Sequence, residues 1–218
     1  MVTVETLFFE LLQVATGQLD CLTRGPEADE WKQLHELSKR HHVEGVAYHG
    51  VMRLFEFGLR APQDVSLDWM ADAEEISERN ELQKKQPAVV RFYSDDLKQL
   101  RQIESEGARY ISRFTIYELY DVYKSGQLDM RTLMDYFFTL QMNGDKYETL
   151  QGGGLLGRVG IRRFASGMMW LMAHTLQLPE QAMPFQPLEA EGRYLLSDMM
   201  GHQPRWMHIR HRWAWFQF

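Results

Sequence analysis

Cysteine is nearly absent from the chain. It occurs once in 218 residues, at Cys21, so no internal disulfide framework can form, and this is typical of proteins in a reducing compartment. Long apolar runs are also missing, because the richest run, residues 168–173, is far shorter than the ~18 residues that a membrane-spanning helix needs. Residues 1–17 contain two glutamates and no basic leader, unlike a signal peptide. The sequence predicts a soluble, cytoplasmic protein without a transmembrane segment.

Positive charge is in deficit as well. The chain has 24 Lys and Arg against 30 Asp and Glu, which gives a net charge of −6. A protein of this charge is not built to wrap a polyanion, so nucleic acid is not the expected partner of the chain as a whole. Apolar residues make up 44% and charged residues 25%, a composition typical of a folded globular protein.

Alternating strand patterns are missing, whereas helical periodicity runs through most of the chain. The predicted fold class is all-α, an irregular multi-helix bundle. Gly17 and Gly58 are expected to end two of the helices, and Asp129 is expected to cap the start of another with its carboxylate. The expected helices are 4–15, one after Pro26, 44–57, one after Pro62, one after Pro87, 114–124, 130–142, 161–176 and 188–200.

The stretch from Gln102 to Ser112 is the most plausible internal boundary. It predicts an N-terminal helical region, 1–106, and a C-terminal helical region, 107–218, with a single compact domain as the alternative. In the helix after Pro62, acids recur on one side, and they predict a solvated stripe. Its members are Asp64, Asp68, Asp72, Glu75 and Glu78.

No complete catalytic motif is present. The glycine-rich segment 151–157 follows a polar stretch instead of a buried strand and lacks a Lys-Ser or Lys-Thr pair, so it is interpreted as a turn between helices. A nucleotidyltransferase site needs a Gly-Ser turn before two metal-binding acids that alternate along a strand. No Gly-Ser dipeptide occurs, and the nearest alternating acids, Asp72 and Glu74, lie in a predicted helix.

Four residues near one helix start have the chemistry of metal ligands: His41, His42, Glu44 and His49. Their spacing matches no zinc signature, so we interpret them as a polar helix end with one histidine in the core. Cys21 has no evident histidine partner that would make it a nucleophile. The sequence therefore predicts no catalytic, cofactor-binding or metal-binding residue.

The last residues of the chain interleave basic and aromatic side chains. The candidate partner-binding residues there are Arg205, Trp206, Arg210, Arg212 and Trp213. Docking of this segment onto the protein's own core or onto a protein partner is the favoured interpretation. Binding to nucleic acid or to a membrane surface is the alternative, because basic groups contact phosphates and aromatic rings stack on bases or lie at lipid interfaces.

Four segments of the chain carry a resemblance to a known family. They are LSKRHHVEGVAYHGVMRL (37–54), GQLDMRTLMDYFFTL (126–140), RFASGMMW (163–170) and EGRYLL (191–196). In the same order, they resemble segments of the uncharacterised nucleotidyltransferase family of Bacteroidetes-type bacteria. In the second segment, Arg131, Leu133, Met134, Asp135 and Tyr136 match the family's Leu-Arg-x-Leu-x-Asp-Tyr/Trp pattern.

The resemblance implies an α/β catalytic module with bound Mg²⁺, but only residues 97–114 bridge the place where it belongs. The chain is therefore expected to be a non-catalytic, core-deleted member that acts as a helical interaction module or is a remnant. The alternative is an active Mg²⁺-dependent nucleotidyltransferase. Loss of the module should also uncover helix faces, which predicts self-association or a protein partner, with an exposed apolar patch around Phe114, Tyr117 and Tyr120.

Overall fold

A computed structural model describes residues 2–83, 116–143 and 161–203. All regular elements in these ranges are helices and none is a strand, which confirms the predicted all-α class. The chain divides into two compact units, Met1–Val90 and Arg91–Phe218. The boundary predicted between residues 106 and 107 lies outside the described residues, so it stays a prediction. Within the described ranges, no helix combines the length and apolar character needed to cross a membrane.

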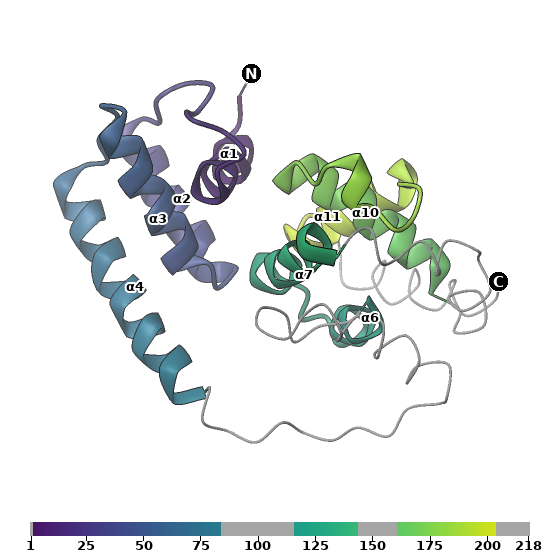
Figure 1. The fold of residues 1–218 in the computed structure, drawn as a ribbon. Helices are drawn as coiled ribbons and strands as arrows, with labels where there is room; N and C mark the ends of the chain where they lie inside the picture. Colours follow the sequence, from purple (N-terminus) through teal and green to yellow (C-terminus); the bar gives the residue numbers. More distant parts are fainter. Residues whose placement is uncertain (1, 84–115, 144–160, 204–218) are drawn as a thin grey trace. The chain divides into compact units, whose positions relative to one another are not determined.

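The first unit is a packed group of helices (Figure 1). Helix α3 packs against α1 and α4, and α2 packs against all three others. The core is built from the apolar face of α1, including Leu7, Phe8 and Leu11, and from Trp31 and Trp69 of the neighbouring helices, all buried. The helices of this unit are α1 (Val4–Thr16), α2 (Ala28–Arg40), α3 (Glu44–Glu56) and α4 (Gln63–Gln83).

Local signals end two helices of this unit, α1 and α3, where the sequence predicts. Gly17 follows α1 with φ 78°, and its N–H donates to the carbonyl oxygens of Gln13 and Val14. Gly58 follows α3 with φ 89°. Both values lie in the left-handed region that glycine adopts without steric cost, so each glycine can reverse the chain after its helix.

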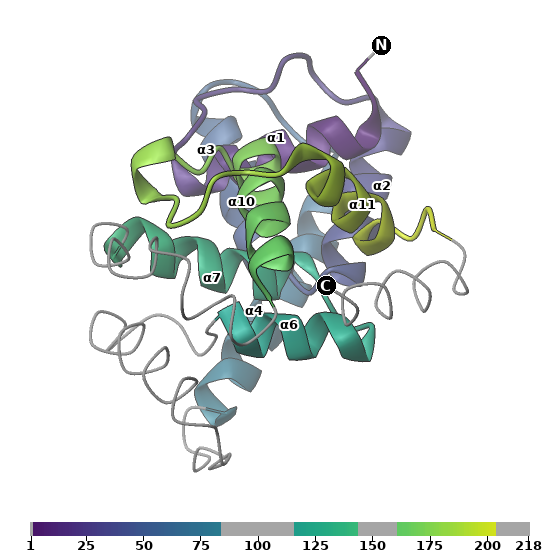
Figure 2. The same cartoon turned by 90° about the vertical axis from the view of Figure 1, so that its right-hand side faces the viewer.

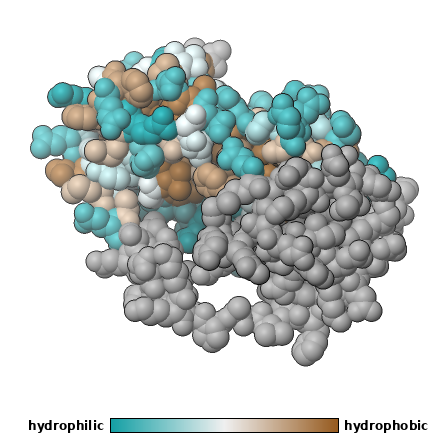
Figure 3. Space-filling view, viewed as in Figure 1, coloured by the Kyte–Doolittle hydropathy of each residue, from teal (hydrophilic) through white to brown (hydrophobic). Residues whose placement is uncertain are grey.

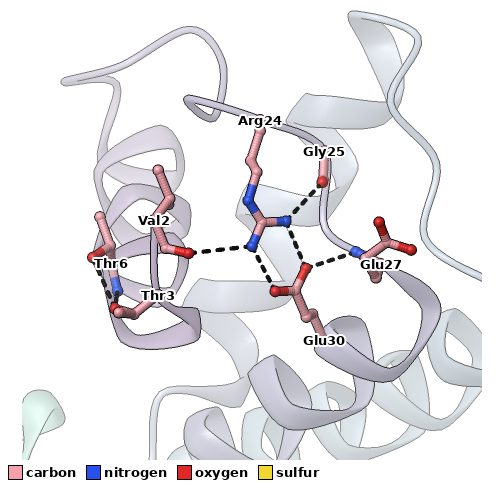
Figure 4. A network of polar contacts seen from close by, with 7 residues as sticks. All are labelled: Val2, Thr3, Thr6, Arg24, Gly25, Glu27 and Glu30. Atoms are coloured by element: carbon pink, nitrogen blue, oxygen red, sulfur yellow. Dashed lines mark hydrogen bonds and ion pairs between the residues drawn. The ribbon is translucent and has the colours of Figure 1, made fainter.

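Helix α2 begins with a network of polar contacts (Figure 4). Arg24 donates to both carboxylate oxygens of Glu30, at 2.6 and 2.5 Å, and also to the carbonyl oxygen of Val2 at 3.3 Å. The backbone N–H of Glu27 donates to Glu30 at 2.8 Å, which completes a capping box at the first turn. A bidentate pair of this kind fixes orientation, so the network ties the residues before α1 to the start of α2.

The Glu30 carboxylate makes this unit sensitive to acid. The hydrogen bonds from Arg24, and then the one from the Glu27 backbone, lower the pKa of Glu30 from 4.5 to about 2. The unfolded chain therefore binds a proton at a higher pH than the folded chain, and the contribution is lost as the pH falls from 4.5 towards 2. Urea unfolding from neutral pH to about pH 3 should show a smaller fall in midpoint for Glu30→Gln than for wild type. Glu36→Gln, an exposed change on the same helix, should keep the wild-type fall.

The second unit is also a packed group of helices (Figure 2). Helix α10 packs extensively on α11 and also contacts α7, which in turn contacts α6. Oδ1 of Asp129 accepts a hydrogen bond from the backbone N–H of Thr132 at 2.9 Å, which confirms Asp129 as the N-cap before α7. The elements are α6 (Ile116–Ser125), α7 (Met130–Asn143), α10 (Arg162–Leu176), the short 3₁₀ helix η2 (Glu180–Ala182) and α11 (Glu189–Met199).

Candidate functional site

One polar cluster links α2 to α4. Nε2 of His35 and Nζ of Lys39 lie 2.8 and 3.1 Å from the same oxygen, Oδ2 of Asp72. Partial burial would raise the pKa of Asp72, but the hydrogen bonds from Lys39 and His35 outweigh it and hold the pKa below its ordinary value. The prediction of a solvated stripe is therefore wrong at Asp72, because this residue follows the buried Trp69 by three positions and turns towards α2. Asp64 and Asp68 are exposed, as predicted.

The group of candidate metal ligands separates in the structure. His41 is buried with its ring 5.8 Å from that of Phe8, whereas His42 and His49 are exposed and Glu44 is buried at the start of α3. This confirms a polar helix end with one histidine in the core. Across the described ranges, no group of three or more His, Cys, Asp or Glu residues is arranged to hold a metal ion.

Other predicted features have mixed outcomes. Asp72 and Glu74 lie in helix α4, as predicted, and not on a strand. Cys21 is exposed. The glycine-rich segment 151–157 and the candidate partner-binding residues lie outside the described residues, so those interpretations stay predictions. The partner-binding set is Arg205, Trp206, Arg210, Arg212 and Trp213.

Segment 37–54 of the family resemblance lies in the first unit, and the other three segments contribute to the packing of the second unit. Nε of Arg163 on α10 lies 2.9 Å from the buried carboxylate of Glu191 on α11. Gly167 faces Glu191 and Leu195, and Gly192 faces the Trp170 ring so closely that no Cβ fits between them. In segment 126–140, which includes part of α7, Leu133 and Tyr136 of the family pattern are buried in the core. These side chains therefore have a packing role, whatever their ancestry.

The predicted apolar patch is wrong at Tyr120. This side chain is buried, with its ring 5.2 Å from that of Phe164 on α10. Phe114 and the side chain of Tyr117 lie outside the described residues. Most of the large apolar side chains that are exposed in the described ranges belong instead to the first unit.

Five of the six large apolar residues that are exposed in the described ranges belong to α3, α4 and the residue after α3. We name this set the α3–α4 apolar surface: Met52 (45% exposed), Phe55 (50%), Phe57 (61%), Leu67 (52%) and Met70 (37%). Brown, hydrophobic patches lie among teal ones over this unit in the space-filling view (Figure 3).

Helical spacing groups four of these five side chains in two pairs. Met52 and Phe55 are three residues apart on α3, and Leu67 and Met70 are three apart on α4, so each pair shares one face of its helix. Helices α3 and α4 pack against each other, and the Arg60 guanidinium lies 4.9 Å from the centre of the Phe55 ring. The sequence carries a signal for this surface that periodicity alone does not resolve. The apolar residues at positions 65, 67, 69 and 70 are distributed around the axis of α4, so they cannot all lie on one buried face of the helix.

The comparisons with known proteins give no relative for this chain. No family model matches it, and neither a curated protein nor a solved structure does. The function is therefore inferred from the residues and contacts described above.

Proposed function

We propose that the chain is a non-catalytic helical interaction module that binds a protein partner through the α3–α4 apolar surface. The observation that carries the proposal is the concentration of large exposed apolar side chains on one helix pair of a unit with a well-formed core. Single exposed apolar residues are ordinary on any protein, whereas a group of them marks an interaction site. Burying such side chains against a partner contributes roughly 25 cal/mol per Å² of apolar surface, before the costs of association and side-chain ordering are subtracted.

Two carboxylates with contacts between helices support the proposal that the chain is non-catalytic. One oxygen of Asp72 contacts both Lys39 and His35, so Asp72 links two helices. Glu191 is buried and forms an ion pair with Arg163 where α10 packs on α11. Both acids serve packing. A core-deleted member of the nucleotidyltransferase family, which the sequence resembles, would keep such helices and lack the metal-binding strand.

Site-specific photo-crosslinking in cells tests the proposal. A benzophenone-bearing residue replaces Leu67, which is on the α3–α4 apolar surface, or Lys32, which is exposed on α2. Position 67 should give a discrete crosslinked protein that position 32 does not give. Equal products from the two positions, or none from either, would contradict an interaction surface at this place.

A surface variant separates binding from folding. Leu67→Gln with Met70→Gln keeps good helix formers at two exposed positions, so each change should alter the unfolding free energy by no more than about 0.5 kcal/mol. The crosslink from a neighbouring probe at position 74 should nevertheless be lost. Urea unfolding followed by circular dichroism checks the first expectation. An undiminished crosslink would show that these two side chains are not contacts.

A further inference from the structure

The outer face of α4 combines apolar and acidic side chains. Asp64, Leu67, Met70 and Glu74 are exposed, and their spacing of three or four residues places them along one side of the helix. Asp68 is exposed beside them. The 21 residues of α4 include seven acids and a single base, Arg79. The apolar pair is therefore bordered by negative charge at both ends.

We infer that the partner of this face is a basic amphipathic helix, and this inference rests on the proposed function. The apolar side of such a helix would cover Leu67 and Met70, while its Lys and Arg residues would lie near Asp64, Asp68 and Glu74. A helix that lays its apolar face on an exposed apolar strip is a recurring mode of peptide recognition. Complementary charge around the strip selects the partner and speeds its association.

The same charges disfavour the other occupants. A second copy bound about a two-fold axis would bring the same acidic face of α4 against itself, and like charges across an interface repel. Nucleic acid would place phosphates beside Asp64, Asp68 and Glu74, where no exchange of counterions for Lys or Arg contacts can favour binding. A helix that carries both cations and apolar side chains can contact the apolar pair and the acidic residues of this face together.

Fluorescence anisotropy with designed peptides tests this inference on the full chain. The probe is a labelled Leu/Lys amphipathic helix of about 20 residues, which spans roughly 30 Å and so matches α4. Two further peptides are its Leu/Glu counterpart and a scrambled Leu/Lys sequence without an apolar face. The Leu/Lys helix should bind at least about tenfold more tightly than either of them, which corresponds to about 1.4 kcal/mol.

Matched variants locate the contact. Asp64→Asn, Asp68→Asn and Glu74→Gln together should weaken binding of the Leu/Lys helix about eightfold, if each exposed ion pair contributes about twofold. An equal neutralisation elsewhere in the first unit, with Asp20→Asn, Asp29→Asn and Glu36→Gln, should leave affinity within about twofold. Added salt should reduce wild-type affinity more than that of the α4 variant.

The outcomes separate this inference from the proposed function. Equal affinity for the Leu/Lys and Leu/Glu helices would overturn the inference and leave an apolar docking surface without charge selection. Equal affinity for the Leu/Lys helix and the scrambled peptide would mean that charge attraction alone explains binding, and this result would also overturn the inference. No binding of any peptide, or equal loss in both neutralised variants, also overturns it, while a crosslink at position 67 would still support the proposed function.

Discussion

Gly50→Ala is expected to lower the unfolding free energy of the first unit by about 2–3 kcal/mol. A Cβ at this position would lie 2.6 Å from the backbone oxygen of Leu11, 3.0 Å from its Cδ1 and 3.4 Å from the Cβ of Ala15. A backbone oxygen cannot rotate away as a side chain can, so α1 and α3 would have to move apart. This cost exceeds the gain of up to about 1 kcal/mol that alanine brings to a helix.

Gly45→Ala is the matched control, because it makes the same substitution in the same helix. Apart from its chain neighbours and the nearby backbone of its own helix, no atom lies within 4 Å of a Cβ built at Gly45. The alanine should therefore stabilise the unit, by up to about 1 kcal/mol. Urea unfolding followed by far-ultraviolet circular dichroism measures both variants. A change of the same sign in both would show that the α1–α3 approach is not as close as described.

Gly192→Ala should have a comparable effect in the second unit. A Cβ there would lie 2.3 Å from Cε3 of Trp170, and that ring is stacked on His174 with centroids 4.7 Å apart. The overlap should cost about 2–3 kcal/mol, net of the helix preference for alanine. Hydrogen exchange of the α10 and α11 amides reports this loss for the second unit specifically.

A double variant identifies the cause of that loss. Trp170→Ala removes the ring that the new Cβ meets, so Gly192→Ala should cost at least about 1 kcal/mol less in the Trp170→Ala background. Strict additivity of the two changes would mean that Gly192→Ala acts through something other than contact with Trp170.

Helix limits could be predicted where the signal is local. Gly17, Gly58 and Asp129 act on the backbone within four residues, so the sequence alone places the helix ends that they form. The all-α class follows from the same kind of evidence, because periodicity identifies an apolar face on most of the helices.

The partners of those faces could not be predicted in the same way. Periodicity places Tyr120 on the apolar face of a helix, but only the fold shows that the Phe164 ring covers this side chain. Likewise, charge alone placed Asp72 in solvent, whereas its position three residues after Trp69 turns it towards His35 and Lys39. The close approach of α1 to α3 at Gly50 is likewise visible only in the fold.

The exposure of the α3–α4 apolar surface could not be predicted from the sequence for a related reason. Single exposed apolar residues are common, so Leu67 or Phe55 alone carries no signal of function in a sequence. The fold separates the apolar residues of α4 into two sets, because Val65 and Trp69 are buried and Leu67 and Met70 are exposed. Helix α4 thus has one face in the core of the first unit and another face that is exposed.

Calorimetric titration of the full chain with each of the four nucleoside triphosphates and Mg²⁺ most directly separates a helical interaction module from an active nucleotidyltransferase. If the chain only binds a protein partner, no titration should give saturable heat at nucleotide concentrations up to about 1 mM. This concentration is the weak end of ordinary enzyme–substrate affinity. Saturable heat that requires Mg²⁺ and disappears with a chelator would contradict that account and favour an active nucleotidyltransferase.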